Sequence, residues 1–321
     1  MTSSTNRRVF VTSAAFVVAA GLAAAPALSQ DDFKAAIVMP GNITDQSWNQ
    51  TGYEGIKRAE EQLGIEVAYS ERVHQPDQLE ALTDYARRGY DVVIGHGGEF
   101  VDAVQRAAER HPDTLFVVTN GFISDDNISS VTFNFKQFGY AIGFLAGKMS
   151  EAGKGGYISA QQIQVATDLE DGFKQGFRSV HPDAEILVAY TNDWDDVAKA
   201  KEAALNQLDQ GVDVIFPLLD NAQIGALQAA QERDAWSFGV WQDIYENWPD
   251  TALQSAVMDF RIALVDYLRL VRDGATEGTV YQFDIGTDAG TLGTYNPAIP
   301  EDIVAETEAV VAKLNSGEIQ P

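Results

Sequence analysis

Cysteine is absent from all 321 residues of the chain. The sequence therefore has no disulfide, no thiolate metal ligand, no cysteine nucleophile and no N-terminal cysteine that could carry a lipid. Histidine is scarce, and the four histidines of the chain show no i,i+4 or metal-ligand spacing: His74, His96, His111 and His181. We therefore predict no metal site.

Motifs for phosphate, dinucleotide and acyl chemistry are missing too. No G-x-G-x-x-G follows the first strand-like segment, and neither G-x-x-x-x-G-K-[ST] nor G-x-S-x-G occurs. Paired acids such as Asp195-Asp196 are common in so acidic a chain and do not by themselves indicate a hydrolase. We predict no catalytic residue and no cofactor, and we favour a binding protein over an enzyme. A secreted nucleoside hydrolase that uses Asp or Glu pairs is the alternative.

Positive charge is in short supply. Lys and Arg number 22 against 47 Asp and Glu, which gives a formal net charge of −25. Such a field repels nucleic acid and anionic lipid, so neither is an expected partner. The same charge also serves simply to keep a secreted protein soluble, which is the plainer interpretation.

Residues 1–29 have the features of an export signal. Arg7-Arg8 precede an uncharged apolar stretch over residues 9–25, and Ala27-Leu28-Ser29 supplies small residues for cleavage. We predict cleavage after Ser29 and a periplasmic location, by the general or the twin-arginine route. The stretch is short and rich in Ala and Gly for a span of about 20 apolar residues, so an uncleaved anchor is the alternative.

The mature sequence contains a repeat with a nearly constant offset. Residues 55–118 are echoed by residues 176–240 at an offset between 121 and 123 positions, so that Gly55 matches Gly176. Short apolar runs alternate with helical patterns in both copies, as in βαβ units on a parallel sheet. We predict an α/β protein with two Rossmann-like lobes and a ligand between them.

The lobes are expected to share the chain unevenly. We predict that lobe one comprises residues 30–136 plus 245–275 and lobe two residues 137–244 plus 276–321. The chain would cross first near the helix expected over residues 137–150. The tail would return to the first lobe and end on the second, an expectation that rests on analogy with two-lobed folds.

The loops after the strands are the candidate site, because ligands of parallel sheets bind beyond the carboxyl ends of the strands. These loops hold aromatic, acidic and amide side chains but no Lys or Arg, which disfavours an anionic ligand. A planar, neutral or weakly basic heterocycle fits better, stacked on aromatic rings and donating N–H groups to carboxylates. The candidate ligand-binding residues are Asp45, Trp48, Asn49, Gly97, Gly98, Phe122, Trp194, Asp220, Trp241 and Asp243.

Structural roles compete with binding at several of these positions. Trp48 and Trp194 are alternatively plugs that pack on their own lobes, and Asp45 and Asp220 are alternatively helix caps. Gly97-Gly98 is alternatively a tight turn alone.

Two segments carry a family resemblance. Residues 45–55, with Asp45-Gln46-Ser47-Trp48-Asn49 and Gly55, resemble the opening motif of the basic-membrane-protein family of ABC-transporter substrate-binding proteins. Residues 135–147 and 192–196 resemble that family's lobe crossing and second aromatic loop. The resemblance runs over nearly all of the mature chain.

The resemblance implies a type I periplasmic-binding-protein fold, capture of purine nucleosides or bases, and delivery to a permease. It places Trp48 and Trp194 on the two faces of the base, with Asp220 and Asp243 as polar contacts. One departure is Gly239-Val240-Trp241, where nucleoside-binding members usually carry Gly-Val-Asp; no Lys follows Ser255 at the usual spacing either. Both changes favour a free base such as adenine.

The ligand and the partners remain open between a few alternatives. We expect a monomer that meets the membrane only through the ABC permease. Within the same fold, a sugar or a small cation is the alternative ligand, because acidic aromatic pockets also bind quaternary ammonium groups. A receptor-like sensor that serves no permease is a further alternative.

Overall fold

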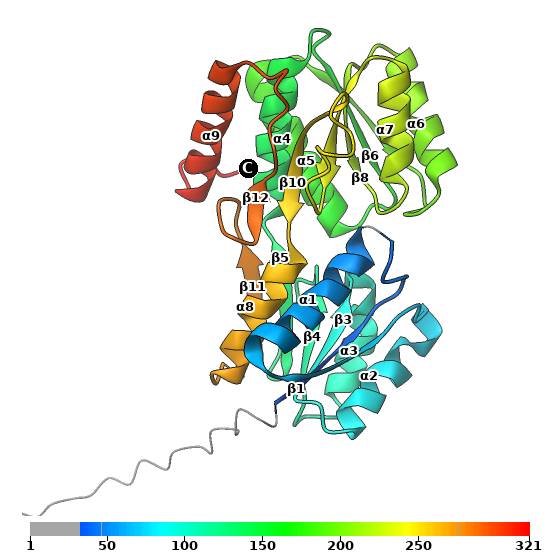
Figure 1. Cartoon of the computed structure of the whole chain (residues 1–321), viewed down its shortest axis with the longest axis vertical. Helices are drawn as coiled ribbons and strands as arrows, with labels where there is room; N and C mark the ends of the chain where they lie inside the picture. Colours follow the sequence, from blue (N-terminus) through cyan, green and yellow to red (C-terminus); the bar gives the residue numbers. More distant parts are fainter. Residues whose placement is uncertain (1–32, 46, 276) are drawn as a thin grey trace, which may run out of the picture.

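The computed structural model describes residues 33–321 except Gln46 and Thr276. It consists of two lobes stacked end to end, each an open sheet covered by helices on both faces (Figure 1). The predicted signal peptide, residues 1–29, lies outside the described residues.

Lobe one contains the described chain up to the end of β5 and one later segment. Its sheet has the order β11-β5-β4-β3-β1-β2, and all of its pairings are parallel. The strands are β1 (Lys34–Val38), β2 (Glu66–Ser70), β3 (Val92–His96), β4 (Leu115–Thr119), β5 (Ile128–Phe133) and β11 (Val280–Phe283). The helices are α1 (Trp48–Leu63), α2 (Gln78–Arg87), α3 (Val101–Ala108) and α8 (Phe260–Arg272), with 3-10 turns η1 (Gln75–Asp77) and η2 (Gly98–Phe100).

Lobe two repeats this design. Its sheet has the order β12-β10-β9-β8-β6-β7, parallel except for the antiparallel pair β10 and β12. The strands are β6 (Lys154–Ser159), β7 (Glu185–Tyr190), β8 (Val214–Leu218), β9 (Trp236–Val240), β10 (Ala252–Met258) and β12 (Gly290–Leu292). The helices are α4 (Phe135–Met149), α5 (Gln164–Val180), α6 (Val197–Asp209), α7 (Gln223–Glu232) and α9 (Glu301–Asn315).

The repeat in the sequence corresponds to the two sheets. β1 to β4 of the first sheet occupy the same positions as β6 to β9 of the second. The matched glycines both lie where two helices pack closely. A Cβ on Gly55 would lie 2.8 Å from the Phe260 carbonyl oxygen on α8. A Cβ on Gly176 would clash with the Tyr140 carbonyl on α4. Each glycine therefore lets two helices pack closely. The predicted α/β class with two parallel-sheet lobes is confirmed.

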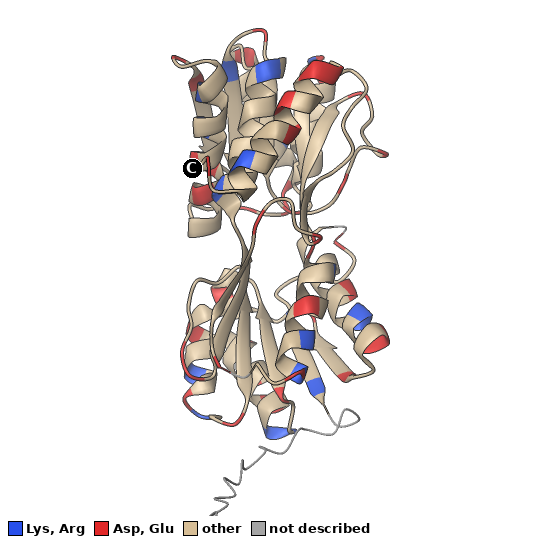
Figure 2. Ribbon diagram, turned by 90° about the vertical axis from the view of Figure 1, so that its left-hand side faces the viewer, with Lys and Arg blue, Asp and Glu red and all other residues tan. Residues whose placement is uncertain are grey.

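The strand pairings differ from the predicted division of the tail. Residues 245–275 were assigned to lobe one, but β10 pairs with β9 in the second sheet. Residues 276–321 were assigned to lobe two, but β11 pairs with β5 in the first sheet. The reason is that a buried apolar strand carries no local mark of the sheet that it joins. The chain crosses between the sheets after β5, after β10 and after β11, at the narrow waist visible in Figure 2.

Candidate functional site

The two lobes meet through the loops at the carboxyl ends of their strands. The ring of Trp48, at the start of α1 in lobe one, lies 4.9 Å from the ring of Trp241, which follows β9 in lobe two. Acidic segments lie among the loops between the lobes (Figure 2). This junction is where most of the predicted site residues gather.

Trp48 is largely enclosed by other rings. Its indole stacks on His96, with centroids 4.1 Å apart and planes at 10°, and Phe260 meets it edge-on at 4.8 Å. The side chain is only 6% exposed. One face of Trp48 is thus covered by His96, and the other neighbours, Phe260 and Trp241, leave little of the ring exposed.

His96 is the fully buried residue that holds Trp48 in place. Its Nε2 lies 3.1 Å from the Trp48 carbonyl oxygen, and its Nδ1 lies 2.9 Å from the Thr119 hydroxyl. A carbonyl only accepts, so Nε2 carries the proton and Nδ1 accepts from Thr119. Burial lowers the pKa of His96 to about 4, against the opposing effect of the Trp48 carbonyl, and the ring is therefore neutral at physiological pH.

Asp45 and Asn49 organise the loop between β1 and α1. The N-cap position of α1 is Ser47, but the Asp45 carboxylate, two residues earlier, accepts hydrogen bonds from the backbone N–H groups of Asn49 and Gln50, at 2.8 and 3.0 Å. It also accepts from the Asn49 side-chain amide at 2.7 Å, and that amide's oxygen accepts from Gly41 N–H at 2.9 Å. Both side chains fix the loop geometry that presents Trp48.

Asp220 is the most perturbed carboxyl group at the junction. Its pKa is raised well above the usual value, first by burial and then by the charges of three other acids: Asp45, Asp195 and Glu99. Its side chain accepts no hydrogen bond from the residues that the structure describes, and it does not cap α7. A ligand with N–H donors or positive charge would supply what this carboxyl lacks.

The acids around Asp220 come from both lobes. Asp45 and Glu99 belong to lobe one, whereas Asp195 belongs to lobe two. Partial desolvation is also the main cause of the raised pKa of Glu99 and of Asp195, although both residues keep exposed surface. We call Asp45, Glu99, Asp195 and Asp220 the cleft carboxylates.

Trp194 lies next to Asp220 through the backbone. Its carbonyl oxygen accepts from the N–H groups of Asp220 and Ala222, at 3.2 and 3.1 Å. The indole is partly buried against the lobe-two core. Within the described part of the chain, no ring contact joins Trp194 to Trp48, so the predicted sandwich stays a prediction.

The next three predicted residues follow the strands β3 and β4 of lobe one: Gly97, Gly98 and Phe122. Gly97 has a backbone φ of 131°, a conformation that residues other than glycine rarely adopt. A Cβ on Gly98 would lie 3.2 Å from the Asn120 carbonyl oxygen. Phe122 is partly buried against the hydrophobic cluster that contains Trp48.

Asp243 is engaged elsewhere. Its carboxylate accepts from the Thr294 N–H and hydroxyl, at 2.8 and 2.6 Å, and from Tyr245 N–H at 3.2 Å. It does not contribute to the raised pKa of Asp220. The structure therefore gives Asp243 a connecting role between the loop after β9 and the segment after β12.

Unpartnered polar atoms also gather in these loops. Four buried side chains after strand ends have a polar atom without a hydrogen-bond partner among the described residues: Ser47, Asn120, Gln223 and Trp241. Each buried polar group without a hydrogen bond lowers the free energy of unfolding by about 1–3 kcal/mol. They are four of the nine such side chains among the described residues, and their polar atoms are available to a ligand at the junction.

Sequence reasoning missed part of this set. Glu99, Asp195 and Asn120 lie in the loops that the sequence singles out, but nothing in the sequence shows that their side chains reach the junction. The sequence places His96 in the candidate loop with Gly97-Gly98, but beyond excluding a metal ligand it assigns no role to this residue. The one available signal was its position as the last residue of a strand, next to the Gly97-Gly98 pair.

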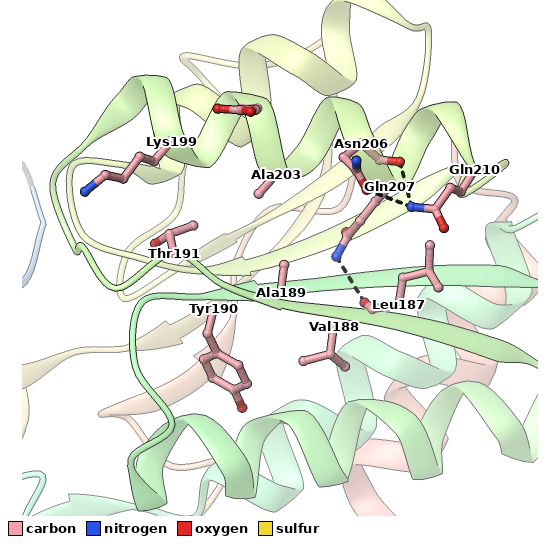
Figure 3. Close-up of a pocket in the computed structure, with 11 residues that line it drawn as sticks. Leu187, Val188, Ala189, Tyr190, Thr191, Lys199, Ala203, Asn206, Gln207 and Gln210 are labelled. Atoms are coloured by element: carbon pink, nitrogen blue, oxygen red, sulfur yellow. Dashed lines mark hydrogen bonds between the residues drawn. The ribbon is translucent and has the colours of Figure 1, made fainter.

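The surface of lobe two also carries a groove away from the junction. A groove of about 540 Å³ lies between the edge strand β7 and helix α6, lined by residues such as Tyr190, Lys199 and Asn206 (Figure 3). It contains none of the predicted site residues. Among residues 33–321, leaving aside positions 46 and 276, no group of His, Asp and Glu is arranged to hold a metal ion, and no helix is long and apolar enough to cross a membrane.

Comparison with known proteins agrees with this architecture. A family model described as ABC transporter substrate-binding protein PnrA-like matches residues 33–320. The chain is 27% identical over 288 residues to the transcriptional activator protein med of Bacillus subtilis, covering 89% of this chain and 90% of that protein. It is 27% identical over 296 residues to a purine-binding protein of Brucella abortus, covering 91% and 84%.

A solved structure extends the likeness to three dimensions. The solute-binding protein of an ABC transporter system from Aeropyrum pernix superimposes with a TM-score of 0.79 at 20% identity, over 90% of this chain and 92% of that one. This likeness confirms the type I periplasmic-binding-protein fold, and the family match confirms the resemblance seen in the sequence. The chain therefore belongs to the family of PnrA-like ABC transporter substrate-binding proteins.

Proposed function

We propose that this protein captures a purine base such as adenine, or a purine nucleoside, between its two lobes. The observation that carries the proposal is the Asp220 carboxyl group, which is partly buried at the lobe junction beside three other acids and receives no hydrogen bond from the described residues. The N–H groups of a purine edge satisfy such an acceptor without adding a second negative charge. A hydrogen bond to a charged acceptor contributes about 1.5–3 kcal/mol.

Aromatic rings would supply the rest of the binding energy. Trp48 keeps one face free of His96, and Trp194 stands in the loop that is fastened to Asp220. A stacked aromatic pair contributes about 0.5–1.5 kcal/mol beyond its area burial. With two rings and two or three hydrogen bonds, we expect affinity in the micromolar range or tighter.

The comparisons support a purine but leave its form open. The Brucella abortus relative bears the name of a purine-binding protein. In this chain Trp241 stands where the family pattern places the acid associated with nucleosides, which favours a free base. Asp45 and Asn49 would act mainly by fixing the loop that carries Trp48.

A small organic cation is the second candidate ligand. The cleft carboxylates would attract positive charge, and tryptophan faces bind quaternary ammonium groups. A purine and a cation differ in their polar edges, since a quaternary ammonium group donates no hydrogen bond.

The cellular setting follows from the same proposal. We infer that residues 1–29 direct export to the periplasm, that the mature protein is a monomer, and that the loaded, closed form docks on an ABC permease. No contact with nucleic acid is proposed, because the net charge is −25.

Thermal unfolding with a ligand panel tests the proposal. The panel contains adenine, guanine, hypoxanthine, their nucleosides, choline and D-ribose, each at about 100 times the expected Kd. A binder at that ratio stabilises the protein by about 2.7 kcal/mol, which is a shift of several degrees. We expect a purine to give the largest shift; a shift with choline or ribose alone would rule the purine out.

A further inference from the structure

Trp241 has an unusual backbone for an aromatic residue. It follows β9 directly, with φ of 71°, in the left-handed region that residues with a side chain seldom occupy. Its N–H is nonetheless hydrogen-bonded to the Ala256 carbonyl at 3.0 Å, so the conformation is held by the sheet. The side chain is thereby directed out of the strand path and toward the other lobe.

The ring of Trp241 forms a wall of the lobe junction. It lies 4.9 Å from Trp48 at an interplanar angle of 52°, and Phe135 meets it edge-on at 6.3 Å. The residue is 3% exposed. Because its plane is strongly tilted from that of Trp48, the two rings do not form the parallel pair that would sandwich a flat ligand.

The indole N–H of Trp241 is buried and unsatisfied. Nε1 has no hydrogen-bond partner among the described residues, and indole nitrogen only donates. A buried donor without an acceptor destabilises the empty protein. Asp220, in the same lobe, presents the complementary case of an acceptor without a donor.

We propose that Trp241 is a specificity-determining residue that donates a hydrogen bond from Nε1 to an unprotonated ring nitrogen of the ligand. The tilted ring packs against Trp48 at the junction. Its N–H donates to an acceptor atom of the ligand, and Asp220 accepts from a donor of the ligand. A ligand edge that alternates N–H groups and bare ring nitrogens satisfies both residues. Because it names the atoms by which the ligand is read, this inference rests on the proposed purine function.

A cycle of variants and analogues tests the hydrogen bond. Wild type and Trp241→Phe are titrated with adenine and with 1-, 3- and 7-deazaadenine, each of which replaces one ring nitrogen by C–H. We expect Trp241→Phe to weaken adenine about ten-fold. We also expect one deaza analogue to bind both proteins equally, because it lacks the atom that Nε1 reads. Trp236→Phe, at the other end of β9, is the matched control and should leave the pattern unchanged.

Equal adenine affinity in wild type and Trp241→Phe would overturn the inference. So would a uniform loss for adenine and all three analogues, because that pattern indicates packing alone. If wild type binds no purine at all, the proposed function fails first, and a ligand-free measurement then decides on Trp241.

That measurement is the thermal stability of the empty protein with Trp241 replaced by 3-benzothienylalanine, which keeps the bicyclic ring and lacks the N–H. An unsatisfied donor predicts an unchanged or higher Tm. A Tm lowered by several degrees would show that the N–H is bonded within the protein and would overturn the inference.

Discussion

The indole of Trp48 and the imidazole of His96 lie face to face, 4.1 Å apart and 10° from parallel. His96 is the last residue of β3 and Trp48 the first residue of α1, both in lobe one, and the Trp48 carbonyl accepts the His96 N–H. A neutral, buried histidine thus fixes the orientation of the ring that is offered to the ligand. The stability of this pair is tied to pH.

The first prediction concerns His96. Its pKa is lowered to about 4 in the folded protein, so between pH 6.5 and 4 the unfolded chain takes up a proton that the folded protein excludes. The stabilisation is complete above pH 6.5 and is lost as pH falls toward 4, by up to about 3 kcal/mol. His96→Gln should remove this part of the pH dependence, measured by urea unfolding at several pH values.

The exposed histidine His74 provides the control, and His74→Gln should keep the wild-type pH profile. If His96→Gln does not fold, NMR titration of the wild-type imidazole replaces it. Protonation of His96 near pH 6.5 in the folded protein would contradict the account.

The second prediction concerns Asp220. Burial and the other cleft carboxylates raise its folded pKa above the unfolded value near 4, so its contribution to stability is present at low pH and lost as pH rises through the folded pKa. At pH 7, Asp220→Asn should raise the Tm of the empty protein and weaken purine binding about 10- to 100-fold. Thermal unfolding and calorimetric titration measure the two effects.

Opposite signs for stability and affinity are what distinguish a binding residue from a structural one here. Asp250→Asn, at an exposed acid, should change neither quantity. A lower Tm for Asp220→Asn together with unchanged affinity would assign Asp220 a structural role.

The third prediction concerns Trp194. Because its side chain is only partly buried, Trp194→Ala should retain the fold, and loss of ring contact with a purine should weaken binding about ten-fold or more. Quenching of tryptophan fluorescence on ligand addition should also decrease. Wild-type affinity in this variant would remove Trp194 from the site.

The fourth prediction separates Asp243 from the ligand. Asp243→Ala removes the carboxylate and should lower stability by about 1–3 kcal/mol, whereas Thr294→Val removes only the hydroxyl donor and keeps the Thr294 N–H, so it should lower stability by less. The double variant should lose little more than Asp243→Ala alone. Purine affinity should change less than three-fold. A large loss of affinity with full stability would return Asp243 to the binding site.

The fold was largely predictable because its signals are local and repeated. The match of Gly55 with Gly176 reflects two equivalent helix contacts, and the alternation of apolar runs and helical patterns reflects two sheets of the same order. The assignment of β10 and β11 to their sheets was not predictable, since pairing is decided by tertiary contacts.

The candidate site was predictable as a set of loops but not as a geometry. Trp48, Asp45 and Asp220 were placed in the loops at the junction, and the alternative of a capping role agrees with the hydrogen bonds that Asp45 accepts at the start of α1, but the same alternative fails for Asp220. The stacking of His96 on Trp48 depends on the end of β3 and the start of α1, which are distant in sequence. The left-handed backbone of Trp241 is likewise set by the sheet and not by the residue's own preference.

The most direct test of the central claim is isothermal titration of the mature protein with adenine at pH 7. The account predicts one site per chain with a Kd in the micromolar range or below, and at least ten-fold weaker binding by Asp220→Asn. Absence of heat with adenine and with every other purine and nucleoside, from a folded protein that binds choline or ribose, would contradict it.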